Sequence, residues 1–475
     1  MLRRTKIVAT LGPASRDPQV LTRMIDAGLD VVRLNFSHGT SAEHRQQVEL
    51  VRILARKAGR AIGVLMDLQG PKIRIGRFRD GKVTLVPGAR FILDAEAEIG
   101  DEHRVGLDYR DLPNDVRPGD TLLLDDGRIV LRVESVEGPR IICIVEQGGV
   151  LSNNKGINRR GGGLSAPALT EKDMHDIEIA AELKADFLAV SFPRSGSDIK
   201  WARDLMERAG GRAFVIAKIE RAEAVPALDE ILDASDGIMV ARGDLAVEVG
   251  DAVVPALQKR MIRRAREKNK VTITATQMME SMINSPIPTR AEVSDVANAV
   301  LDGTDAVMLS AETATGHYPA ETVATMARVC IEAEKEDTFS PERRYSSGPA
   351  EVEEAIARAT VFTANNLDIK AVAAMTQSGK TVLFMSRMHS TVPIYAMSAV
   401  SETRRRVTLF RGVYPIKFKG VRDPERSLHM AEDELLARGA VHNGDYIVLT
   451  IGEPYGKAGG TNTMKIVKVG EHRHA

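Results

Sequence analysis

Cysteine is nearly absent from this chain of 475 residues. Its two cysteines, Cys143 and Cys330, lie far apart and lack the spacing of a metal site. This scarcity excludes a disulfide framework and a zinc site, and it is typical of a reducing compartment. No segment approaches the ~20 apolar residues of a membrane span, and the N-terminus lacks the apolar core of a signal peptide. We therefore expect a cytoplasmic protein that does not enter a membrane.

The chain also lacks an excess of charge of either sign. Lys and Arg together number 65, as do Asp and Glu, so the formal net charge is zero. A neutral chain gives no electrostatic reason to bind nucleic acid or an anionic membrane. Hydrophobic residues make up 43% and charged residues 27%, which is typical of globular proteins. At this length we expect about two to four domains.

The most informative stretch is an apolar run, beginning at Phe214, that ends in charge. Lys218 and Glu220 lie two positions apart, so on a strand they point to the same side. A second apolar run farther along ends in Arg242 and Asp244. Charged side chains at the ends of buried strands cost free energy unless they are paired or hold a metal or an anion. Because magnesium is commonly held by one or two carboxylates plus substrate phosphates, these residues form a candidate Mg²⁺–phosphate site.

Apolar strands alternate with helical patterns in two parts of the chain, which predicts βαβ units and a parallel sheet. Eight strands are expected, over Lys6–Leu11, Asp30–Ser37, Ala61–Asp67, Phe187–Ser191, Phe214–Glu220, Gly237–Asp244, Val271–Gln277 and Ala306–Glu312. Eight such units close into a TIM barrel, whose site lies at the carboxyl ends of the strands. Polar residues gather at those ends: Arg33, Asn35, Ser37, Asp67, Lys218, Glu220, Arg242, Asp244, Thr276, Ser310 and Glu312. We assign residues 1–69 and 167–336 to this barrel, with one of its helices over Arg221–Leu232.

Two further domains are expected. Residues 70–166 show short β-type runs separated by Gly and Pro turns, which predicts an inserted all-β domain with Gly161–Gly163 as a candidate hinge. Glu336–Pro349 has the composition of a linker, and residues 350–475 predict a small open-sheet α/β domain. Its Thr376–Thr381 loop lies between a strand and a helix, where backbone N–H groups can hold a phosphate. It is not a Walker A loop, because Ala374 occupies the place of the first Gly.

Each polar residue at the strand ends also has a purely structural interpretation. Lys218 and Glu220 could be an ion pair that caps the barrel, and Asn35 and Ser37 fit an ordinary turn. For a single pair, that interpretation is favoured. Several separate strands that place unlike charges at one end favour an active site instead. Whether His38, at the rim, touches a ligand stays open at this point.

A set of motifs in one order resembles the pyruvate kinase family over essentially the full chain. The matching stretches are Arg33–Gly39, Gly70–Arg74, Ala217–Glu220, Met239–Leu245, Ala275–Met278, Pro288–Glu292, Asp295–Gly303 and Met308–Thr313. The resemblance implies a phosphotransferase of the last step of glycolysis. Such an enzyme moves the phosphoryl group of phosphoenolpyruvate to ADP and forms pyruvate and ATP.

The resemblance also implies a role for each matching residue. Mg²⁺ or Mn²⁺ would bind to Glu220 and Asp244, and Lys218 would offset the charge of the transferring phosphoryl group. The other implied ligands are Arg33 for the substrate phosphate, the N–H groups of Gly243 and Asp244 with Thr276 for the substrate carboxylate, and Asn35, His38, Arg74 and Lys155 for the nucleotide. Thr276 would also lie near the proton path, with Ser310 and Glu312 as supports. The inserted domain would be a lid that excludes water.

One departure from the family concerns potassium. The family's potassium ligands would be Asn35, Ser37, Asp67 and the carbonyl of Leu68. Cation-dependent members carry Glu where this chain has Lys72, whose ammonium supplies a positive charge of its own. We therefore predict activity without potassium.

The C-terminal domain resembles the family's regulatory domain. Its effector loop would comprise Thr376, Ser378, Gly379, Lys380 and Thr381, with Gly456–Thr463 closing over it. We expect allosteric activation by a sugar phosphate or a nucleoside monophosphate. Assembly into a homotetramer is also implied.

Two other functions serve as alternatives. A metal-dependent carbon–carbon lyase on a similar barrel would need neither a nucleotide nor a lid carrying Arg74 and Lys155. A catalytically silent metabolite sensor is the other alternative, and the intact residues Lys218, Glu220, Asp244 and Thr276 argue against it.

Overall fold

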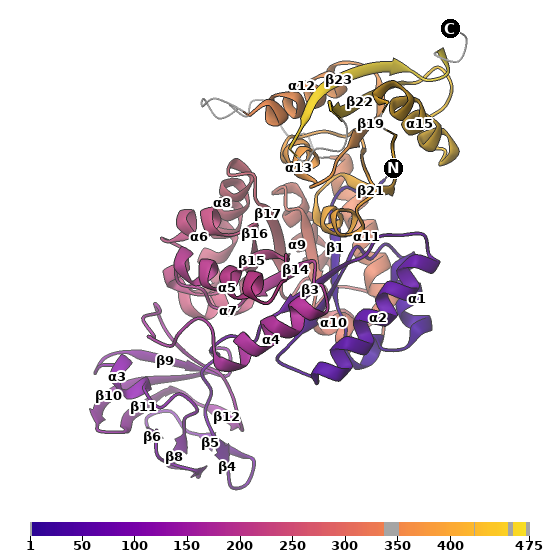
Figure 1. The fold of residues 1–475 in the computed structure, drawn as a ribbon. Coiled ribbons are helices and arrows are strands. Elements are labelled where there is room, and N and C mark those ends of the chain that lie inside the picture. Colours follow the sequence, from indigo (N-terminus) through magenta and orange to yellow (C-terminus); the bar gives the residue numbers. More distant parts are fainter. Residues whose placement is uncertain (1, 337–350, 422, 455–458, 472–475) are drawn as a thin grey trace.

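The computed structural model describes residues 2–336, 351–421, 423–454 and 459–471. Within them, eight parallel strands form a closed barrel in the order β1-β18-β17-β16-β15-β14-β3-β2 (Figure 1). These strands are β1 (Lys6–Thr10), β2 (Val31–Asn35), β3 (Gly63–Asp67), β14 (Phe187–Val190), β15 (Phe214–Ile219), β16 (Gly237–Ala241), β17 (Val271–Ala275) and β18 (Ala306–Leu309). The predicted TIM barrel is confirmed, with a strand in each of the eight expected places.

Helices surround the barrel, and the sequence explains where several of them begin. They are α1 (Pro18–Asp26), α2 (Ser41–Lys57), α4 (Glu171–Glu182), α5 (Gly196–Arg208), α6 (Leu228–Ala234), α7 (Arg242–Val249), α8 (Val254–Glu267), α9 (Arg290–Leu301), α10 (Ala311–Ala314) and α11 (Pro319–Lys335), with short 3-10 turns η1 (Pro13–Ser15), η2 (Ala222–Ala224), η3 (Asp251–Val253) and η4 (Glu280–Ile283). Thr40 and Thr170 each cap a helix, and an acidic residue three positions later returns the hydrogen bond. The helix predicted over Arg221–Leu232 is wrong in its first half, because Pro226 has no N–H with which to continue a helix.

Side chains of the barrel strands alternate between the outer helices and the barrel interior. In β15, Ala217 and Ile219 pack outward against the helices, whereas Ile216 packs in the interior. Because side chains alternate along a strand, Lys218 also faces inward. The same alternation directs Asp67, the last residue of β3, toward the interior.

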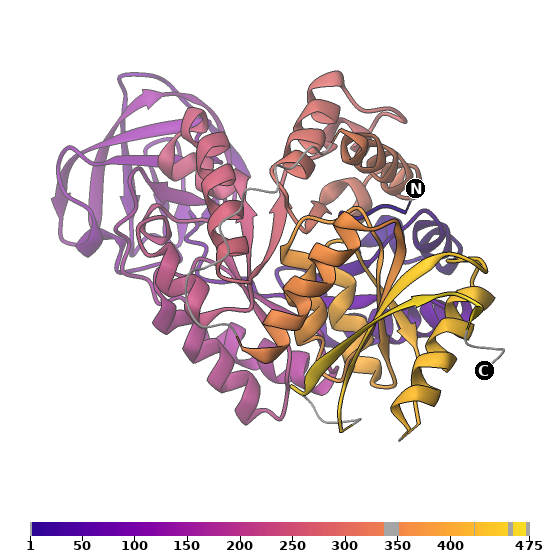
Figure 2. The same cartoon turned by 90° about the horizontal axis from the view of Figure 1, so that it is seen from above.

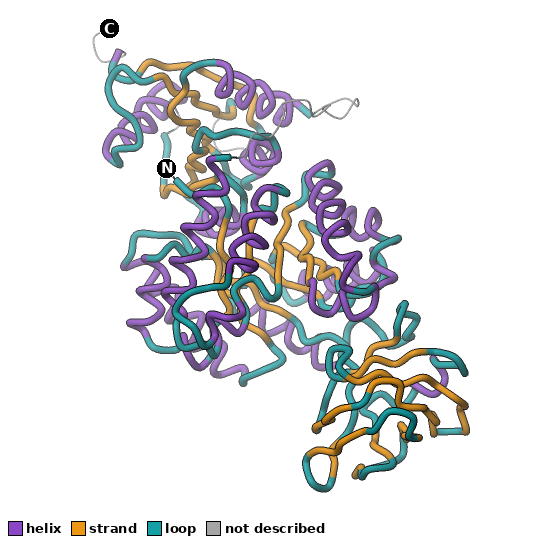
Figure 3. The backbone as a smooth tube through the Cα atoms, turned by 180° about the vertical axis from the view of Figure 1, so that it is seen from behind, coloured by secondary structure: helices purple, strands orange, loops and turns teal. Residues whose placement is uncertain are grey.

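The inserted segment forms a β domain of its own, in which strands and loops predominate (Figure 3). Its strands are β4 (Arg77–Phe78), β5 (Lys82–Leu85), β6 (Arg90–Asp94), β7 (Ile99–Gly100), β8 (Arg104–Gly106), β9 (Thr121–Leu124), β10 (Ile129–Glu137), β11 (Arg140–Gln147), β12 (Gly149–Ser152) and β13 (Ile157–Arg159). Six strands form a sheet in the order β13-β9-β10-β11-β6-β8, and β12-β5 and β4-β7 pair separately. The expectation of an all-β domain is wrong in one detail, since a four-residue helix, α3 (Leu112–Asp115), begins at Leu112 with a proline in its first turn.

The C-terminal domain contains a five-stranded sheet in the order β21-β20-β19-β22-β23, with β23 antiparallel to β22. Its strands are β19 (Ile369–Met375), β20 (Ile394–Ser398), β21 (Val413–Lys417), β22 (Tyr446–Gly452) and β23 (Thr461–Lys468), and its helices are α12 (Val352–Asn366), α13 (Lys380–Arg387), α14 (Ser401–Arg406), η5 (Val407–Leu409) and α15 (Pro424–Ala437). The predicted open-sheet α/β domain is confirmed. The predicted linker, Glu336–Pro349, lies outside the described residues except for its first residue.

The two added domains lie at opposite ends of the barrel (Figures 1 and 2). The C-terminal domain covers the amino ends of the strands: Lys6 at the start of β1 donates to the carbonyl oxygen of Val413 at 2.6 Å, and Arg405 binds Asp186, just before β14, at 2.9 Å. The inserted domain meets the opposite end, where the strands finish. That end is therefore the one open to a substrate.

A single apolar core joins the barrel interior to the C-terminal domain. Leu65 and Phe187 inside the barrel belong to the same buried cluster as Val407 and Phe410 of the C-terminal domain. The barrel is thus closed at its amino end by apolar packing. In the part of the chain that the structure describes, no helix has both the length and the apolar character needed to cross a membrane.

Candidate active site

A row of alternating charges lies at the carboxyl ends of β2, β3 and β15; we name it the charge row. Arg33 Nε donates to Asp67 Oδ2 at 2.6 Å, Asp67 Oδ1 lies 3.2 Å from Lys218 Nζ, and Lys218 Nζ lies 3.0 Å from Glu220 Oε1. The Lys218 side chain is 11% exposed, and both carboxylates are buried. The structure therefore brings together four residues that the sequence places at the ends of three strands.

Burial and pairing shift the pKa values of the charge row in different directions. Burial raises the pKa of Glu220; Lys218 opposes this rise, and the Asp244 and Asp67 carboxylates reinforce it. Burial acts the same way on Asp67, but the Lys218 and Arg33 cations outweigh it, so the pKa of Asp67 is lowered. Burial alone would lower the pKa of Lys218, yet its two carboxylate neighbours raise it. Lys218 is thus an ammonium ion, and Glu220 is the carboxylate whose charge is least compensated.

Asp244 lies in the first turn of a helix rather than on a strand. The sequence analysis placed Arg242 and Asp244 on a strand, but β16 ends at Ala241 and α7 begins at Arg242. The unpaired N–H groups of a first helical turn attract negative charge, which suits a site for anionic substrates. Asp244 Oδ1 accepts a hydrogen bond from Lys72 Nζ at 2.9 Å. Lys72 therefore links the inserted segment to the barrel.

The donor set at Glu220 and Asp244 fits a hard divalent cation. The two carboxylates lie close enough for Asp244 to raise the pKa of Glu220. Among the described residues, no group of three or more His, Cys, Asp or Glu side chains is placed to hold a metal ion. A cation here would rest on two carboxylates and take its remaining ligands from substrate and water, as Mg²⁺ commonly does.

Thr276 follows β17 in a strained turn. Thr276 and Gln277 have φ angles of 71° and 53°, in the left-handed region that costs non-glycine residues of order 1–3 kcal/mol. Arg242 holds this turn, because its guanidinium donates to the carbonyl oxygens of Ala275 and Thr276 at 3.2 and 2.6 Å. Thr276 Oγ1 in turn accepts from the N–H of Gly243 at 2.9 Å. The surrounding hydrogen bonds therefore fix Thr276 beside the first turn of α7.

Glu312 lies behind this turn. It is buried, and burial raises its pKa. Its carboxylate accepts from the N–H groups of Ser310 at 2.6 Å and Met279 at 3.2 Å. Ser310 and Glu312 thus brace the loops after β17 and β18.

His38 is exposed at the rim after β2.

The residues implied as potassium ligands lie beside the charge row. Asn35 pairs with Asp67 in the register of β2 and β3, and Asn35 Oδ1 accepts from the N–H of Ser37 at 3.0 Å. No hydrogen bond or ion pair among the described residues joins Lys72 to Asn35, Ser37 or Asp67. The Lys72 ammonium is instead directed at Asp244.

Arg74 and Lys155 lie next to each other where the chain enters and leaves the inserted domain. A backbone bridge joins Arg74 to Gly156, and the Arg74 guanidinium donates to the carbonyl oxygen of Asn154 at 3.0 Å. Lys155 Nζ lies 2.7 Å from a carboxylate oxygen of Asp125. A cleft of about 560 Å³ separates the inserted domain from the barrel, and its lining includes Lys72, Asp126 and Arg160 on one side and Gly243, Asp244 and Gln277 on the other.

Ser191 and Phe192, which follow β14, were missed by the sequence analysis. Lys218 Nζ donates to Ser191 Oγ at 2.7 Å, and the N–H of Phe192 donates to Glu220 Oε2 at 2.9 Å. Both residues orient the charge row. One signal was available in the sequence: Ser191 is the polar residue that ends the apolar run Phe187–Ser191, as Asp67 ends its own run.

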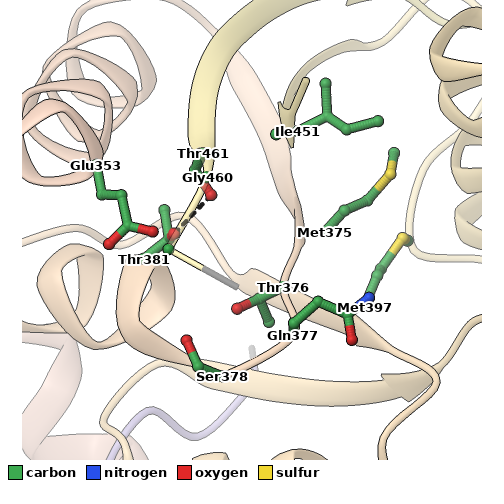
Figure 4. A pocket seen from close by; sticks show the side chains of 12 residues that line it. Glu353, Met375, Thr376, Gln377, Ser378, Thr381, Met397, Ile451, Gly460 and Thr461 are labelled. Carbon is green, nitrogen blue, oxygen red and sulfur yellow. Dashed lines mark hydrogen bonds between the residues drawn. The ribbon is translucent and has the colours of Figure 1, made fainter. Parts of the chain in front are cut away.

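A second candidate site lies in the C-terminal domain at the Thr376–Thr381 loop (Figure 4). Gly379 has a φ angle of 89°, which L residues with a side chain rarely adopt. The N–H of Gly379 donates to Thr376 Oγ1 at 2.9 Å, and the N–H of Lys380 donates to Ser378 Oγ at 3.3 Å. The loop thus bonds to itself at the start of α13.

Side chains from other elements complete this pocket. Figure 4 shows Thr381 bonded to Thr461, at 2.8 Å, with Glu353 beside the pair. Lys380 Nζ lies 3.5 Å from a carboxylate oxygen of Glu353. The predicted closing segment, Gly456–Thr463, lies partly outside the described residues.

Comparisons with known proteins agree with this geometry. Residues 2–323 match the family described as "Pyruvate kinase, barrel domain", and residues 354–467 match "Pyruvate kinase, alpha/beta domain". Pyruvate kinase II of Salmonella typhimurium is 53% identical over 475 residues, which cover 98% of this chain and 99% of that protein. The pyruvate kinases of Haemophilus influenzae and Mycobacterium tuberculosis are 52% and 42% identical, over 95% and 99% of this chain and 96% and 99% of those proteins. The chain therefore belongs to the pyruvate kinase family.

Proposed function

We propose that the charge row and Asp244 carry the reaction of this family, in which phosphoenolpyruvate and ADP yield pyruvate and ATP. The observation that supports this most is the placement of Lys218. Its ammonium is buried between two carboxylates at the substrate-accessible end of the barrel. A fixed cation in a site of low dielectric constant can offset the charge that moves with a phosphoryl group.

Each side chain has a separate task in this proposal. Arg33 grips the phosphate of phosphoenolpyruvate, and the N–H groups of Gly243 and Asp244, with Thr276, receive its carboxylate. Lys218 stays with the phosphoryl group as it passes to ADP. Mg²⁺, or Mn²⁺, held at Glu220 and Asp244 supplies further positive charge to the substrate oxygens when it is bound.

Transfer leaves an enolate, which becomes pyruvate when its carbon takes up a proton. Thr276 lies near that carbon, but a hydroxyl is a weak acid, so water at Thr276 delivers the proton. Arg74 and Lys155, with Asn35 and His38, hold ADP. The inserted domain (residues 70–166) then acts as a lid over the barrel (residues 1–69 and 167–336) and keeps water from the phosphoryl group.

A coupled assay with phosphoenolpyruvate, ADP and Mg²⁺ tests the reaction. We expect pyruvate to form only when ADP is present, with ATP in equal amount. The comparisons give no support to the carbon–carbon lyase alternative. Pyruvate released from an oxaloacetate-like acid without ADP would nevertheless favour it.

We also propose that turnover does not require potassium, because the Lys72 ammonium supplies charge at the edge of the site. The test compares potassium with tetramethylammonium buffers at constant Mg²⁺. Similar rates are expected for the natural chain, and Lys72→Glu is expected to make turnover depend on potassium. A large loss of activity in tetramethylammonium with the natural chain would contradict the proposal.

The C-terminal domain (residues 350–475) is proposed to regulate the enzyme. A sugar phosphate or nucleoside monophosphate at Thr376–Thr381 would activate it, and Ser378→Ala should weaken that activation while leaving turnover at saturating substrate unchanged. A substrate curve unmoved by a panel of such compounds would refute the regulatory role.

A cytoplasmic homotetramer completes the proposal. Sedimentation velocity gives the oligomeric state, and a monomer at assay concentration would contradict the assembly.

A further inference from the structure

A cavity of about 540 Å³ lies at the seam between the barrel and the C-terminal domain; we name it the seam cavity. One wall comes from the end of α2 and the segment leading into β3, and the other from α14, β21 and the residue after α15. Its lining shares no residue with the cleft at Asp244 or the pocket at Thr376–Thr381. Seven cationic side chains line it: Arg52, Arg56, Arg60, Arg404, Arg405, Lys417 and Arg438. No carboxylate is among its described lining residues.

Most of this positive charge has no carboxylate partner. Three of the seven cations do have one, in the pairs Arg60–Asp30, Arg405–Asp186 and Arg438–Glu434. For the other four, Arg52, Arg56, Arg404 and Lys417, no carboxylate oxygen lies within ion-pair distance in the part of the chain that the structure describes. The seam cavity therefore carries a net positive charge.

A second cavity lined by arginines differs from the seam cavity because carboxylates also line it. It measures about 400 Å³, and Arg260, Arg263 and Arg264 line it together with Asp229 and Glu267. Arg264 binds both of these carboxylates, at 2.6 and 3.0 Å. That second cavity contains negative charge of its own, whereas the seam cavity contains none.

The excess charge affects the guanidinium groups themselves. Burial, followed by the neighbouring Arg405 cation, lowers the pKa of both Arg52 and Arg404. Arg52 Nε is buried and has no hydrogen-bond partner among the described residues. The Arg52 guanidinium donates instead through one terminal nitrogen to the carbonyl oxygens of Leu183 and Lys184, at 3.1 and 2.8 Å, which hold the group in place without neutralising its charge.

We propose that the seam cavity binds a small organic compound with at least two negative charges on phosphate. Guanidinium groups match phosphate oxygens in a two-point geometry and keep their charge at every physiological pH. The volume lies within the range of ordinary small-molecule sites. Ala61, Ile62 and Pro415 add an apolar wall, which suits an apolar part of the same ligand.

A ligand in this place touches both domains at once. Ile62 directly precedes Gly63, the first residue of β3, and β3 ends at Asp67 of the charge row. On the other side, Arg404 and Arg405 belong to α14 of the C-terminal domain. Binding would therefore hold the C-terminal domain against the segment that leads to the active site.

Inorganic pyrophosphate is a suitable probe, used with the full chain in a low-salt buffer without Mg²⁺. Hydrogen exchange followed by mass spectrometry shows which segments of the chain the probe protects. We expect pyrophosphate to slow exchange in residues 52–62 and 401–417 of the natural chain. The double variant Arg56→Gln with Lys417→Gln should weaken this protection by about tenfold in pyrophosphate concentration, since it removes two charge-assisted contacts.

The matched control is Lys57→Gln with Lys419→Gln. Lys57 lies one position after Arg56, and Lys419 lies two positions after Lys417. Both are exposed and neither lines the cavity, and their substitution removes the same net charge. The control should shift the concentration by much less than tenfold, because neither Lys57 nor Lys419 lines the cavity and so no charge-assisted contact with the ligand is lost. No protection in the natural chain, equal loss in both variants, or protection by long-chain polyphosphate alone would each overturn the proposal.

Discussion

The two ends of the barrel carry the same kinds of side chain in different states of pairing. At the carboxyl end, Asp67 and Glu220 share the Lys218 ammonium beneath the inserted domain. At the amino end, Asp305 precedes β18 and receives both terminal nitrogens of Arg387, one of them at 2.7 Å. Asp305 and Arg387 are both buried, with 1% and 4% of their side chains exposed.

The pKa shifts show what this difference means. Burial acts to raise the pKa of Asp305, but Arg387 outweighs it and the pKa is lowered. Asp305 also accepts from the N–H groups of Thr272 and Arg411, at 2.9 and 3.1 Å. The pKa of Glu220 is raised instead. A carboxylate whose bonds are complete stabilises the fold, whereas one whose charge is under-compensated is available to a substrate or a metal.

Lys218→Met should have the largest effect, and it should fall on catalysis. Without the ammonium, the charge row keeps only the Arg33 cation and loses the one between its two carboxylates, so we expect turnover to fall by about 10³-fold or more. Steady-state kinetics in the coupled assay measures this, with circular dichroism as the control for folding. A variant with nearly natural turnover would remove Lys218 from the mechanism.

Arg387→Met should have a large effect of the other kind, on stability. It leaves Asp305 charged in a buried place, which typically costs about 3–5 kcal/mol. We expect a much lower midpoint of urea denaturation, with a smaller loss of turnover than in Lys218→Met. Arg387→Lys keeps the charge and should be intermediate. An unchanged midpoint in Arg387→Met would contradict the inference that the pair at the amino end stabilises the fold.

The smallest effect is expected from the protonation of Glu248, a residue of α7 that lies where the inserted domain meets the barrel. It concerns how the stability of this contact changes with pH. The Glu248 carboxylate accepts from Asn158 Nδ2 at 3.3 Å and from the N–H of Ala222 at 2.7 Å. Burial raises the pKa of Glu248 to about 7; Glu223 adds to the rise and Arg221 opposes it. The folded chain therefore holds this proton more tightly than an unfolded chain, whose carboxyl titrates near 4.5. The stability that the group contributes is complete below that value and is lost as the pH rises through about 7.

Glu248→Gln tests this assignment, because the amide stays neutral at every pH. In the natural chain, we expect limited proteolysis near Gly161–Gly163 to become faster between about pH 6 and 8 as the carboxyl loses its proton. The variant should lose most of this pH dependence. Glu178→Gln, at an exposed position of α4, is the control and should keep it. Identical profiles for the natural chain and Glu248→Gln would show that another group is responsible.

Much of the fold was predictable because its signal is local. Apolar runs separated by helical patterns gave every barrel strand, and the alternation of side chains placed Arg33, Asp67 and Lys218 on one face. The break at Pro226 and the helix that begins at Arg242 were not predicted. In both places the strand-helix rhythm continues in the sequence while the exact boundary depends on packing.

The site was less predictable wherever its geometry comes from contacts between distant segments. Ser191 binds Lys218 across two strands, and Phe192 binds Glu220 through a backbone N–H that no side-chain pattern reveals. The direction of Lys72 toward Asp244 depends on how the inserted domain sits on the barrel. The seam cavity gave no signal at all, since its cations come from segments that are hundreds of residues apart.

The core shared by the barrel and the C-terminal domain limits how this protein could be shortened. A fragment that ended after α11 would leave the amino end of the barrel uncovered. Apolar side chains that are now buried, such as Phe187, would then be exposed to water. The C-terminal domain is therefore part of the packing that closes the amino end of the barrel. We therefore expect evolution to alter the C-terminal domain by substitution rather than by deletion, because deletion would expose this shared core to water.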